Sequence, residues 1–476
     1  MSPQDSALRG SGAVDLAELA PFASPEQLDP ALERFLQRAS GLLCDWLARA
    51  SGGSPLPPLS VLPSLEPEIQ GLGPDRLLAD LQQVMEGAFN PSHPGALAHL
   101  DPPALSASIA ADLICAGLNN NLLAEELSPS LSRLERGLCR WFARQLGLGE
   151  GSGGVPASGG SLSNLMALVA ARCSRGLAQR ADAVVLCSED AHVSFAKAMT
   201  VMGLPPQALR RLPVDADGRL CVGALEQALV QLERAGTPVI AVVATAGTTV
   251  RGAVDPLPAI ASLCRRHNHW LHVDGAIGAV FALAPDQRQR LQGLELADSI
   301  TVNPQKLLGI TKTSSLLLLA QAGVMQQAFG TGLPYMEPSW GGGHGGELGL
   351  QGSRPAEILK LWLGLRQLGL EGINALVDGA IERRRLLQQR LASDGRLLLC
   401  GGPLHLLAFR PRCGDAPALA RWSERCRAAL LAEQLMLSRP HYQGLHHLKA
   451  VLGNPHTRPE HLARLADVVA STPLED

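Results

Sequence analysis

The sequence contains few of the features that mark several large classes of protein. Aromatic residues make up only 3% of the 476 residues, and just two of them are tyrosines. The 41 lysines and arginines nearly balance the 44 aspartates and glutamates, and no run of like charge stands out, so neither nucleic acid nor an anionic membrane is an expected partner. The most apolar later stretch, "SSLLLLA", is too short to cross a bilayer. A small-molecule enzyme or a protein-binding module remains.

The ten cysteines are scattered along the chain. They form no Cys-x-x-Cys pair and have no histidines at the spacing of a zinc site, so we expect reduced, buried thiols and no metal centre. The N-terminal segment "MSPQDSALRGSGAVDLAEL" has neither the basic start nor the apolar core of a secretory signal. These features predict a cytoplasmic protein.

The length of the chain predicts a large domain and a smaller one. Residues 1–90 contain helical stretches broken by "SGGSPLPPLSVLPSLEPE", which indicates a helical arm. Residues 91–370 alternate short apolar runs with helical ones, which is typical of an α/β domain with a mostly parallel sheet. Residues 371–476 are predicted to form a small α+β domain, in which Thr457 and Glu460 have capping-box spacing before the last helix.

Five apolar runs in the predicted large domain indicate buried strands. They lie at residues 183–188, 239–247, 270–276, 299–304 and 313–320. The last run follows the fourth too closely for a crossover helix, so we expect these two strands to be antiparallel. Because ligands of open α/β sheets bind beyond the carboxyl ends of the strands, polar residues at those ends are the candidates for a site.

Several such residues could bind a planar, phosphorylated ligand. The turn "VPASGGSLSN" precedes a helix, so the N–H groups of Gly160 and Ser161 could hold a phosphate, although a Ser/Gly turn that only caps the helix is the simpler interpretation. His192 follows another strand, where an imidazole could stack on a ring, but a single loop histidine is more often structural. Thr245 ends a third strand among small residues and could donate a hydrogen bond.

Asp274 and Lys306 follow the next two strands. Alone they could form a buried ion pair. With a phosphate cradle and an imidazole, they complete the set that pyridoxal 5'-phosphate (PLP) requires, namely a phosphate anchor, a ring stacker, a pyridinium partner and a Schiff-base amine. An ionised Asp274 would keep the pyridine nitrogen protonated, while Gly275, Ala276 and Gly278 leave space under the ring.

A series of motifs between about residue 90 and the C-terminus points to one enzyme family. They are "HPGALAHLDPP", "NNNLLAEELSPSLSRLE", "SGGSLSNLMAL", "SEDAHVSFAKA", "ATAGTTVRGAVDP", "HVDGAIGA", "NPQK" and "SRPAEILKLWLGLRQLG". In these motifs the sequence resembles the pyridoxal-dependent group II amino acid decarboxylases, which act on aromatic amino acids, glutamate, cysteine sulfinate or diaminobutyrate. The resemblance implies the PLP-dependent transferase-like fold (fold type I), release of CO2 and an amine from an L-amino acid, and a homodimer.

The resemblance also implies roles for individual residues. Lys306 would form the Schiff base, Asp274 would pair with the pyridinium, and His192 would stack on the ring. The other implied cofactor contacts are Gly160, Ser161, Asn303 and Gln305 at the phosphate, and Thr245 and Ala276 beside the ring.

Three further residues are implied to serve the reaction or the substrate. Tyr335 lies where many members carry the tyrosine of a mobile loop that protonates the substrate carbon, although it could be an ordinary loop aromatic. Arg354 matches an arginine near the active site of the family. His99 lies where glutamate-type members have a glutamine that contacts the substrate.

The chain departs from the family pattern at three places. Gln305 replaces the usual histidine, and its amide can still donate to phosphate but has no imidazole chemistry. The usual Asp-Ala-Ala-aromatic sequence is Asp-Gly-Ala-Ile at residues 274–277, and the usual aromatic pair in the pocket wall is Ala96 and Leu97. With so few aromatic residues, these changes favour a non-aromatic substrate.

Two alternatives to decarboxylation stay open from the sequence. Another PLP enzyme, either aldehyde-forming or transaminating, would use the same Lys306 and Asp274. A catalytically degenerate scaffold would need none of these residues, and it is therefore disfavoured by the nearly complete set of predicted cofactor contacts.

Overall fold

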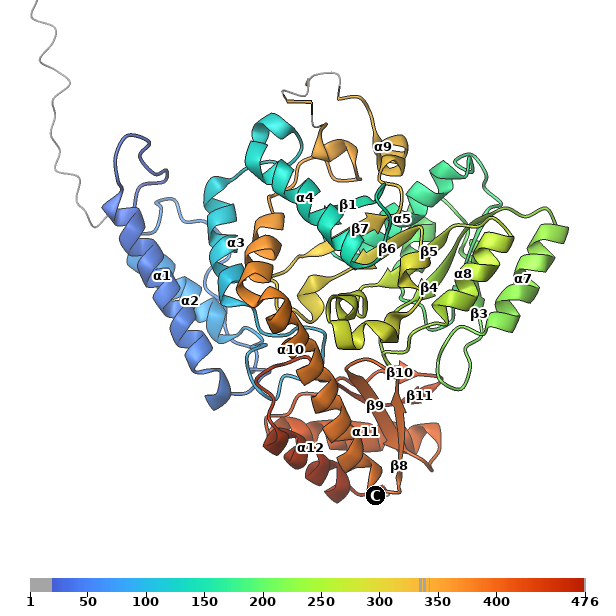
Figure 1. Ribbon diagram of the computed structural model, residues 1–476. Helices are drawn as coiled ribbons and strands as arrows, with labels where there is room; N and C mark the ends of the chain where they lie inside the picture. Colours follow the sequence, from blue (N-terminus) through green and yellow to red (C-terminus); the bar gives the residue numbers. More distant parts are fainter. Residues whose placement is uncertain (1–18, 334–335, 337–339, 342, 475–476) are drawn as a thin grey trace, which may run out of the picture. The chain divides into compact units, whose positions relative to one another are not determined.

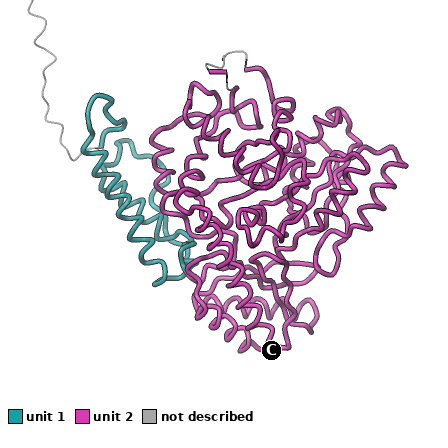
Figure 2. Tube along the Cα trace, in the orientation of Figure 1, with its two compact units in different colours: residues 1–93 teal, residues 94–476 magenta. Residues whose placement is uncertain are grey.

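The computed structural model describes residues 19–333, 336, 340–341 and 343–474 (Figure 1). The chain divides into two units, residues 1–93 and residues 94–476 (Figure 2). In the first unit, α1 (Pro30–Ala48) packs against α2 (Pro74–Glu86). The side chain of Asp29 caps α1 by accepting two N–H groups of its first turn.

A seven-stranded sheet lies at the centre of the second unit. In spatial order its strands are β1 (Gly153–Ala157), β7 (Ser315–Leu319), β6 (Ser299–Val302), β5 (Leu271–Gly275), β4 (Val239–Thr245), β2 (Val184–Ser188) and β3 (Leu209–Leu212). Neighbouring strands from β6 to β3 are parallel, whereas β7 is antiparallel to β6 and β1. The predicted α/β fold and the predicted antiparallel strand are both confirmed.

Helices cover both faces of this sheet (Figure 1). Their bounds are α3 (Ser106–Leu118), α4 (Pro129–Gln145), α5 (Gly160–Ser174), α6 (Ser194–Val201), α7 (Val222–Arg234), α8 (Leu257–Arg266), α9 (Gly323–Phe329) and α10 (Ile358–Ala392). On one face α4, α7, α8 and α10 pack against alternate strand residues such as Leu316 and Leu318. On the other, α5, α6 and α9 pack against residues such as Val185 and Leu317. No helix in the described ranges combines the length and apolarity of a membrane span.

A smaller sheet lies toward the C-terminus. Its antiparallel strands are β8 (Leu397–Gly401), β9 (Leu406–Pro411) and β12 (Leu448–Val451), and a hairpin is formed by β10 (His441–Tyr442) and β11 (Leu445–His446). With α11 (Ala416–Ala432) and α12 (Pro459–Ser471), the three-stranded sheet forms a separate core that includes Phe409 and Trp422.

The helix α10 connects the two sheets of this unit. Its residues up to Ala380 pack in the core of the large sheet, whereas Leu387 and Leu391 pack in the core of the small sheet. The helix is interrupted at Gly369, whose φ of 61° and ψ of 179° are not helical. This break lies next to residue 370, but the division at residues 90 and 370 stays a prediction.

The last helix begins differently from the prediction. The hydroxyl of Thr457 donates to the carbonyl oxygen of Pro94 at 2.7 Å, and α12 starts at Pro459. The N–H of Arg458 is accepted by His461 Nδ1 at 3.0 Å. The expected capping box of Thr457 and Glu460 was therefore wrong, because Thr457 is used in a contact with a distant segment.

Candidate active site

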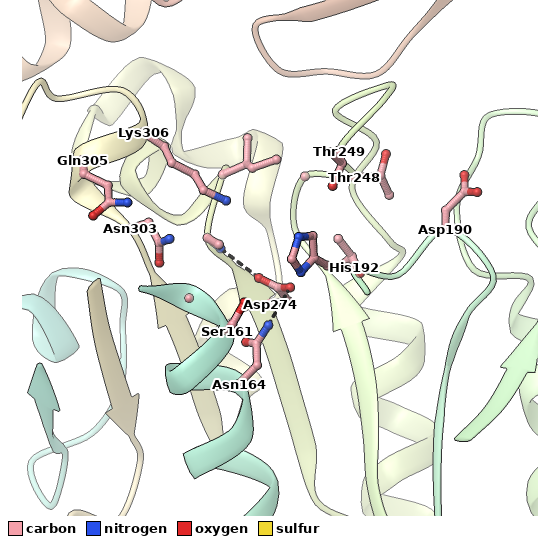
Figure 3. A pocket seen from close by; sticks show the side chains of 15 residues that line it. Ser161, Asn164, Asp190, His192, Thr248, Thr249, Asp274, Asn303, Gln305 and Lys306 are labelled. Carbon is pink, nitrogen blue, oxygen red and sulfur yellow. Dashed lines mark hydrogen bonds between the residues drawn. The ribbon is translucent and has the colours of Figure 1, made fainter. Parts of the chain in front are cut away.

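A cavity of about 230 Å³ lies at the carboxyl ends of β4, β5 and β6, beside the first turn of α5 (Figure 3). It is lined by Gly160, Ser161, Asn164, Asp190, His192, Thr245, Gly247, Thr248, Thr249, Asp274, Ala276, Ile277, Asn303, Gln305 and Lys306. Every residue that the sequence analysis assigned to the cofactor is among them. The parallel strands bring these distant segments together because their carboxyl ends meet at one edge of the sheet.

The start of α5 forms one wall of the cavity. Gly159 precedes the helix with a φ of 92°, a conformation that glycine adopts readily. A Cβ atom at Gly160 would lie 3.0 Å from Asn303 Nδ2 and 3.1 Å from Asn303 Oδ1. The N–H groups of Gly160 and Ser161 belong to the first turn, where a helix has no internal acceptor for them. This wall can therefore accept an anion at close range.

The turn after β6 forms the opposite wall. Pro304–Lys306 is a single 3₁₀ turn, and the N–H of Ser314 donates to Gln305 Oε1, which fixes the orientation of the Gln305 amide at the cavity wall. The Lys306 side chain extends into the cavity (Figure 3). Burial lowers the pKa of the Lys306 amine, and the nearby carboxylate of Asp274 partly opposes this effect. A larger share of neutral, nucleophilic amine results.

Asp274 lies next to the last residue of β5, at the floor of the cavity, and is buried. Its Oδ1 accepts the N–H of Ala276 at 3.2 Å, and its Oδ2 accepts Asn164 Nδ2 at 3.0 Å (Figure 3). The two bonds hold the carboxylate in one orientation.

His192 lies across the cavity from α5, and Ser194 fixes its ring. The N–H of Ser194 donates to His192 Nδ1 at 3.2 Å, so Nδ1 is an acceptor. Burial lowers the pKa of this imidazole, an effect that Asp274 opposes and Lys306 reinforces. The ring is therefore neutral near physiological pH and carries its proton on Nε2.

The end of β4 is held by a buried carboxylate outside the cavity wall. Asp255 accepts the N–H of Thr245 at 2.7 Å and the N–H of Leu220 at 2.7 Å. Burial raises the pKa of Asp255 to about 6. These bonds fix the backbone that presents the Thr245 hydroxyl.

Two buried polar atoms of the cavity wall, Thr245 Oγ1 and Asn303 Oδ1, have no hydrogen-bond partner among the described residues. Such atoms are rare in proteins unless a ligand or water satisfies them. Together with the close approach of the Gly160 backbone to Asn303, the Asp274 carboxylate and the Lys306 amine, they fit a phosphorylated pyridine aldehyde. The residues present are therefore suited to PLP.

Several residues at or beside the cavity were not predicted from the sequence. Asn164 and Asp190 lie inside the motifs "SGGSLSN" and "SEDAH". Tyr442, on β10, donates its hydroxyl to Asp190 Oδ2 at 2.7 Å. Lys449, on β12, donates to the carbonyl oxygen of Thr249 at 3.2 Å. No local pattern in the sequence marks the last two, because both come from the distant C-terminal region.

The buried ammonium of Lys449 carries an unbalanced charge. Only 6% of the residue is exposed, and burial together with the charge of Lys306 lowers its pKa to about 8. No carboxylate within the described part of the chain forms an ion pair with Lys449. An isolated buried charge is unfavourable, so this ammonium is a candidate site for an anion.

Two predicted residues, Arg354 and His99, do not line this cavity. Arg354 is buried in a two-pronged ion pair with Glu135, with both contacts at 2.5 Å. His99 is an exposed residue, and the partial burial of its imidazole, followed by the charge of Lys449, lowers its pKa, an effect that Asp101 opposes. Tyr335 falls outside the described residues.

Comparisons with known proteins agree with this site. The chain matches the pyridoxal-dependent decarboxylase conserved domain over residues 58–411. It is 32% identical over 422 residues to the L-2,4-diaminobutyrate decarboxylase of Rhizobium meliloti (strain 1021), covering 86% of this chain and 84% of that protein. It is 30% identical over 369 residues to the cysteine sulfinic acid decarboxylase of Mus musculus, covering 74% of this chain and 72% of the relative.

The fold is similar to that of a solved relative. The crystal structure of mouse CSAD in its apo form superposes with a TM-score of 0.84 at 25% identity, over 93% of this chain and 99% of that one. Family, fold and cavity chemistry agree. The chain therefore belongs to the pyridoxal-dependent decarboxylase family, and it is a PLP-dependent enzyme that decarboxylates an amino acid.

Proposed function

We propose that the substrate is an L-amino acid with a small, polar, non-aromatic side chain, and that L-2,4-diaminobutyrate is the first candidate. The composition of the cavity wall supports this most directly. None of its described residues is phenylalanine, tyrosine or tryptophan, whereas Asp190, Thr248 and Thr249 offer polar groups. The similarity to diaminobutyrate and cysteine sulfinic acid decarboxylases points to the same class of substrate.

We infer that the cavity residues hold PLP in the following way. The N–H groups of Gly160 and Ser161, with the amides of Asn303 and Gln305, bind its phosphate. Thr245 and Ala276 border the ring, and His192 covers one of its faces. Asp274 holds a proton on the ring nitrogen. When bound, the cofactor supplies an electron sink for the bond that breaks.

Lys306 Nζ is the proposed covalent attachment point. Its lowered pKa favours the neutral amine, which is the form that would hold the aldehyde group of the cofactor. The same amine would also be placed to hold a proton for the reacting carbon. Tyr335 stays the predicted proton donor to that carbon.

Lys449 is the proposed partner of the substrate carboxylate. Its ammonium is buried beside Lys306 and donates to the backbone of the cavity-lining Thr249. A carboxylate would neutralise this charge, so binding orients the bond to be broken. His99 and Arg354 remain proposed substrate contacts from the resemblance alone.

We further infer that the protein is a cytoplasmic homodimer. Half-exposed apolar residues on α3, namely Leu113, Ile114 and Leu118, support a contact with a second copy. The proposed organisation is a helical arm (1–90), a large PLP-binding domain (91–370) and a small domain (371–476).

A substrate panel tests the proposed function. Purified protein with added PLP is incubated with each common L-amino acid, diaminobutyrate and cysteine sulfinate, while CO2 release and amine mass are recorded. We expect amine from diaminobutyrate and none from the Lys306→Ala control. Preference for an aromatic amino acid would contradict the proposed substrate. An aldehyde product in place of the amine would instead favour the aldehyde-forming alternative.

A further inference from the structure

The amide of Asn164, on α5, lies behind the carboxylate of Asp274 and uses every hydrogen-bonding position it has. Its Nδ2 donates to Asp274 Oδ2 at 3.0 Å and to Ser194 Oγ at 3.0 Å. Its Oδ1 accepts from Thr301 Oγ1 at 2.7 Å and faces His272 Nε2 at 3.1 Å. The residue is 1% exposed, so water does not compete for these positions.

The opposite orientation of this amide is unfavourable. A flipped Asn164 would turn Oδ1 toward the Asp274 carboxylate, which would place two acceptors face to face. It would also turn Nδ2 toward the N–H of His272. The Asp274 carboxylate and an N–H at His272 Nε2 therefore both favour the observed orientation of the amide.

The surroundings of His272 determine which ring nitrogen carries the proton. His272 is fully buried on β5, and burial lowers its pKa to about 4, so the ring is neutral with one donor and one acceptor. Its Nδ1 lies 2.9 Å from Ser299 Oγ, which in turn accepts Trp270 Nε1–H at 2.9 Å. Because Trp270 can only donate, the Ser299 hydroxyl is free to donate to Nδ1. Because Asn164 Nδ2 is engaged by Asp274, the atom that faces His272 Nε2 is the acceptor Oδ1, so the proton of His272 lies on Nε2.

The hydrogen bonds form a chain with one direction. Each donor points toward the cavity, from Trp270 through Ser299 and His272 to Asn164 and Asp274. A branch reaches the other side of the cavity, because Ser194 accepts from Asn164 and its N–H donates to His192 Nδ1. One amide thus connects both side chains that face the proposed ring position.

We propose that His272 and Asn164 are positioning residues for the cofactor: neutral His272 orients the Asn164 amide, and Asn164 aims Asp274 at the ring nitrogen. The inference rests on the proposed role of Asp274. A purely structural network would lower the stability of the protein when broken but would leave cofactor affinity unchanged in the variants that still fold.

The test compares PLP affinity of full-length variants after removal and titration of the cofactor, followed by its absorbance. His272→Phe removes the donor at similar size, and we expect about tenfold weaker binding. His272→Gln restores an N–H donor near the Nε2 position and should recover affinity to within about threefold of wild type. His269→Phe is the matched control, since His269 lies outside the chain of bonds and contacts Arg175.

Asn164→Asp gives the sharpest comparison, because it replaces the donor to Asp274 with an acceptor of the same shape. We expect the largest loss of affinity here, at least about tenfold. Thermal unfolding of the cofactor-free variants separates this loss from misfolding. If His272→Phe fails to fold, Ser299→Ala, which frees the His272 tautomer and also removes the acceptor of Trp270 Nε1–H, should still weaken binding by about threefold.

Two results would overturn the inference. One is PLP affinity equal to wild type in folded His272→Phe or Asn164→Asp. The other is equal loss in His272→Phe and His272→Gln. Turnover is a separate readout: a wild-type protein that binds PLP but releases no CO2 would contradict the proposed function, while the affinity comparison would still decide the role of His272.

Discussion

At the residue scale, burial determines the charge of the groups around the cavity. It lowers the pKa of Lys306, His192 and Lys449, while the carboxylate of Asp274 opposes the effect at the first two. Lys306 therefore has more neutral amine than an exposed lysine. Lys449, with its pKa near 8, keeps most of its charge at neutral pH. The two lysines thus suit different tasks, one nucleophilic and one electrostatic.

Removal of the Lys449 charge should weaken substrate binding more than it slows the chemical step. The proposed carboxylate contact exists in the bound substrate and disappears with CO2, so Lys449→Met should raise KM at least about tenfold and change kcat less. Lys449→Arg keeps the charge and should retain part of the affinity. Steady-state kinetics on the best substrate measures both. An unchanged KM in Lys449→Met would contradict the role.

The buried imidazole of His272 should make stability depend on pH. Its folded pKa of about 4 lies below the ordinary value of 6.5. Between pH 6.5 and about pH 4 the unfolded chain therefore binds a proton that the folded chain does not. Stability is lost as the pH falls through this range. In His272→Gln the unfolding free energy should fall by about 3 kcal/mol less over the same window. Denaturant unfolding across that range measures the difference, and equal slopes would refute it.

Residue-scale prediction from the sequence succeeded where a motif ended a strand. Asp274 and Lys306 stood out as isolated charges after apolar runs. Asn164 did not, because its importance comes from a hydrogen bond to a residue 110 positions away. Lys449 lies still farther along the chain from the cavity residues, and one sequence does not reveal such neighbours.

At the element scale, the apolar runs predicted the central strands but not the edges of the sheet. All seven residues of β4 are buried, which matches its continuous apolar pattern. By contrast, β1 consists of "GGVPA", whose glycines and proline argue against a strand. It forms because β7 provides an antiparallel partner, and Pro156 is tolerated on an edge strand.

The close packing of α5 against the turn after β6 also yields a prediction. In Gly160→Ala the new methyl group would meet the Asn303 amide at about 3.0 Å and displace it. PLP affinity should fall by about tenfold, as expected for overpacking in a tight contact. Gly117→Ala on α3, where an added Cβ meets nothing within 4 Å, is the matched control. Equal cofactor affinity in both variants would contradict the proposed phosphate cradle.

At the scale of the whole molecule, two cores meet at the cavity. The large sheet and the turns after its strands supply the residues that line it. The small sheet reaches Thr249 through Lys449, and the β10–β11 hairpin reaches Asp190 through Tyr442. The interruption of α10 at Gly369 lies between the sequence segments of the two sheets. The fold class could be predicted from the sequence pattern. The contacts of Lys449 and Tyr442 with the cavity wall could not, and they are seen only in the structure.

Association of two copies is predicted at this scale. The apolar residues exposed on α3 would be covered in a homodimer. Light scattering on the purified protein should therefore give twice the chain mass of 50.1 kDa. Leu113→Asp together with Ile114→Asp should shift the mass toward one chain, while an exposed leucine of α10, Leu370→Asp, serves as the control. A wild-type mass of one chain would contradict the dimer.

The central claim is that PLP is bound covalently in this cavity through Lys306. The most direct test is to reduce the PLP-loaded protein with borohydride, which fixes a Schiff base permanently, and to locate the added mass by peptide mass spectrometry. We predict the label on the peptide that contains Lys306, and none in Lys306→Ala. A label on Lys449, the other buried lysine beside the cavity, or on no single lysine would contradict the account.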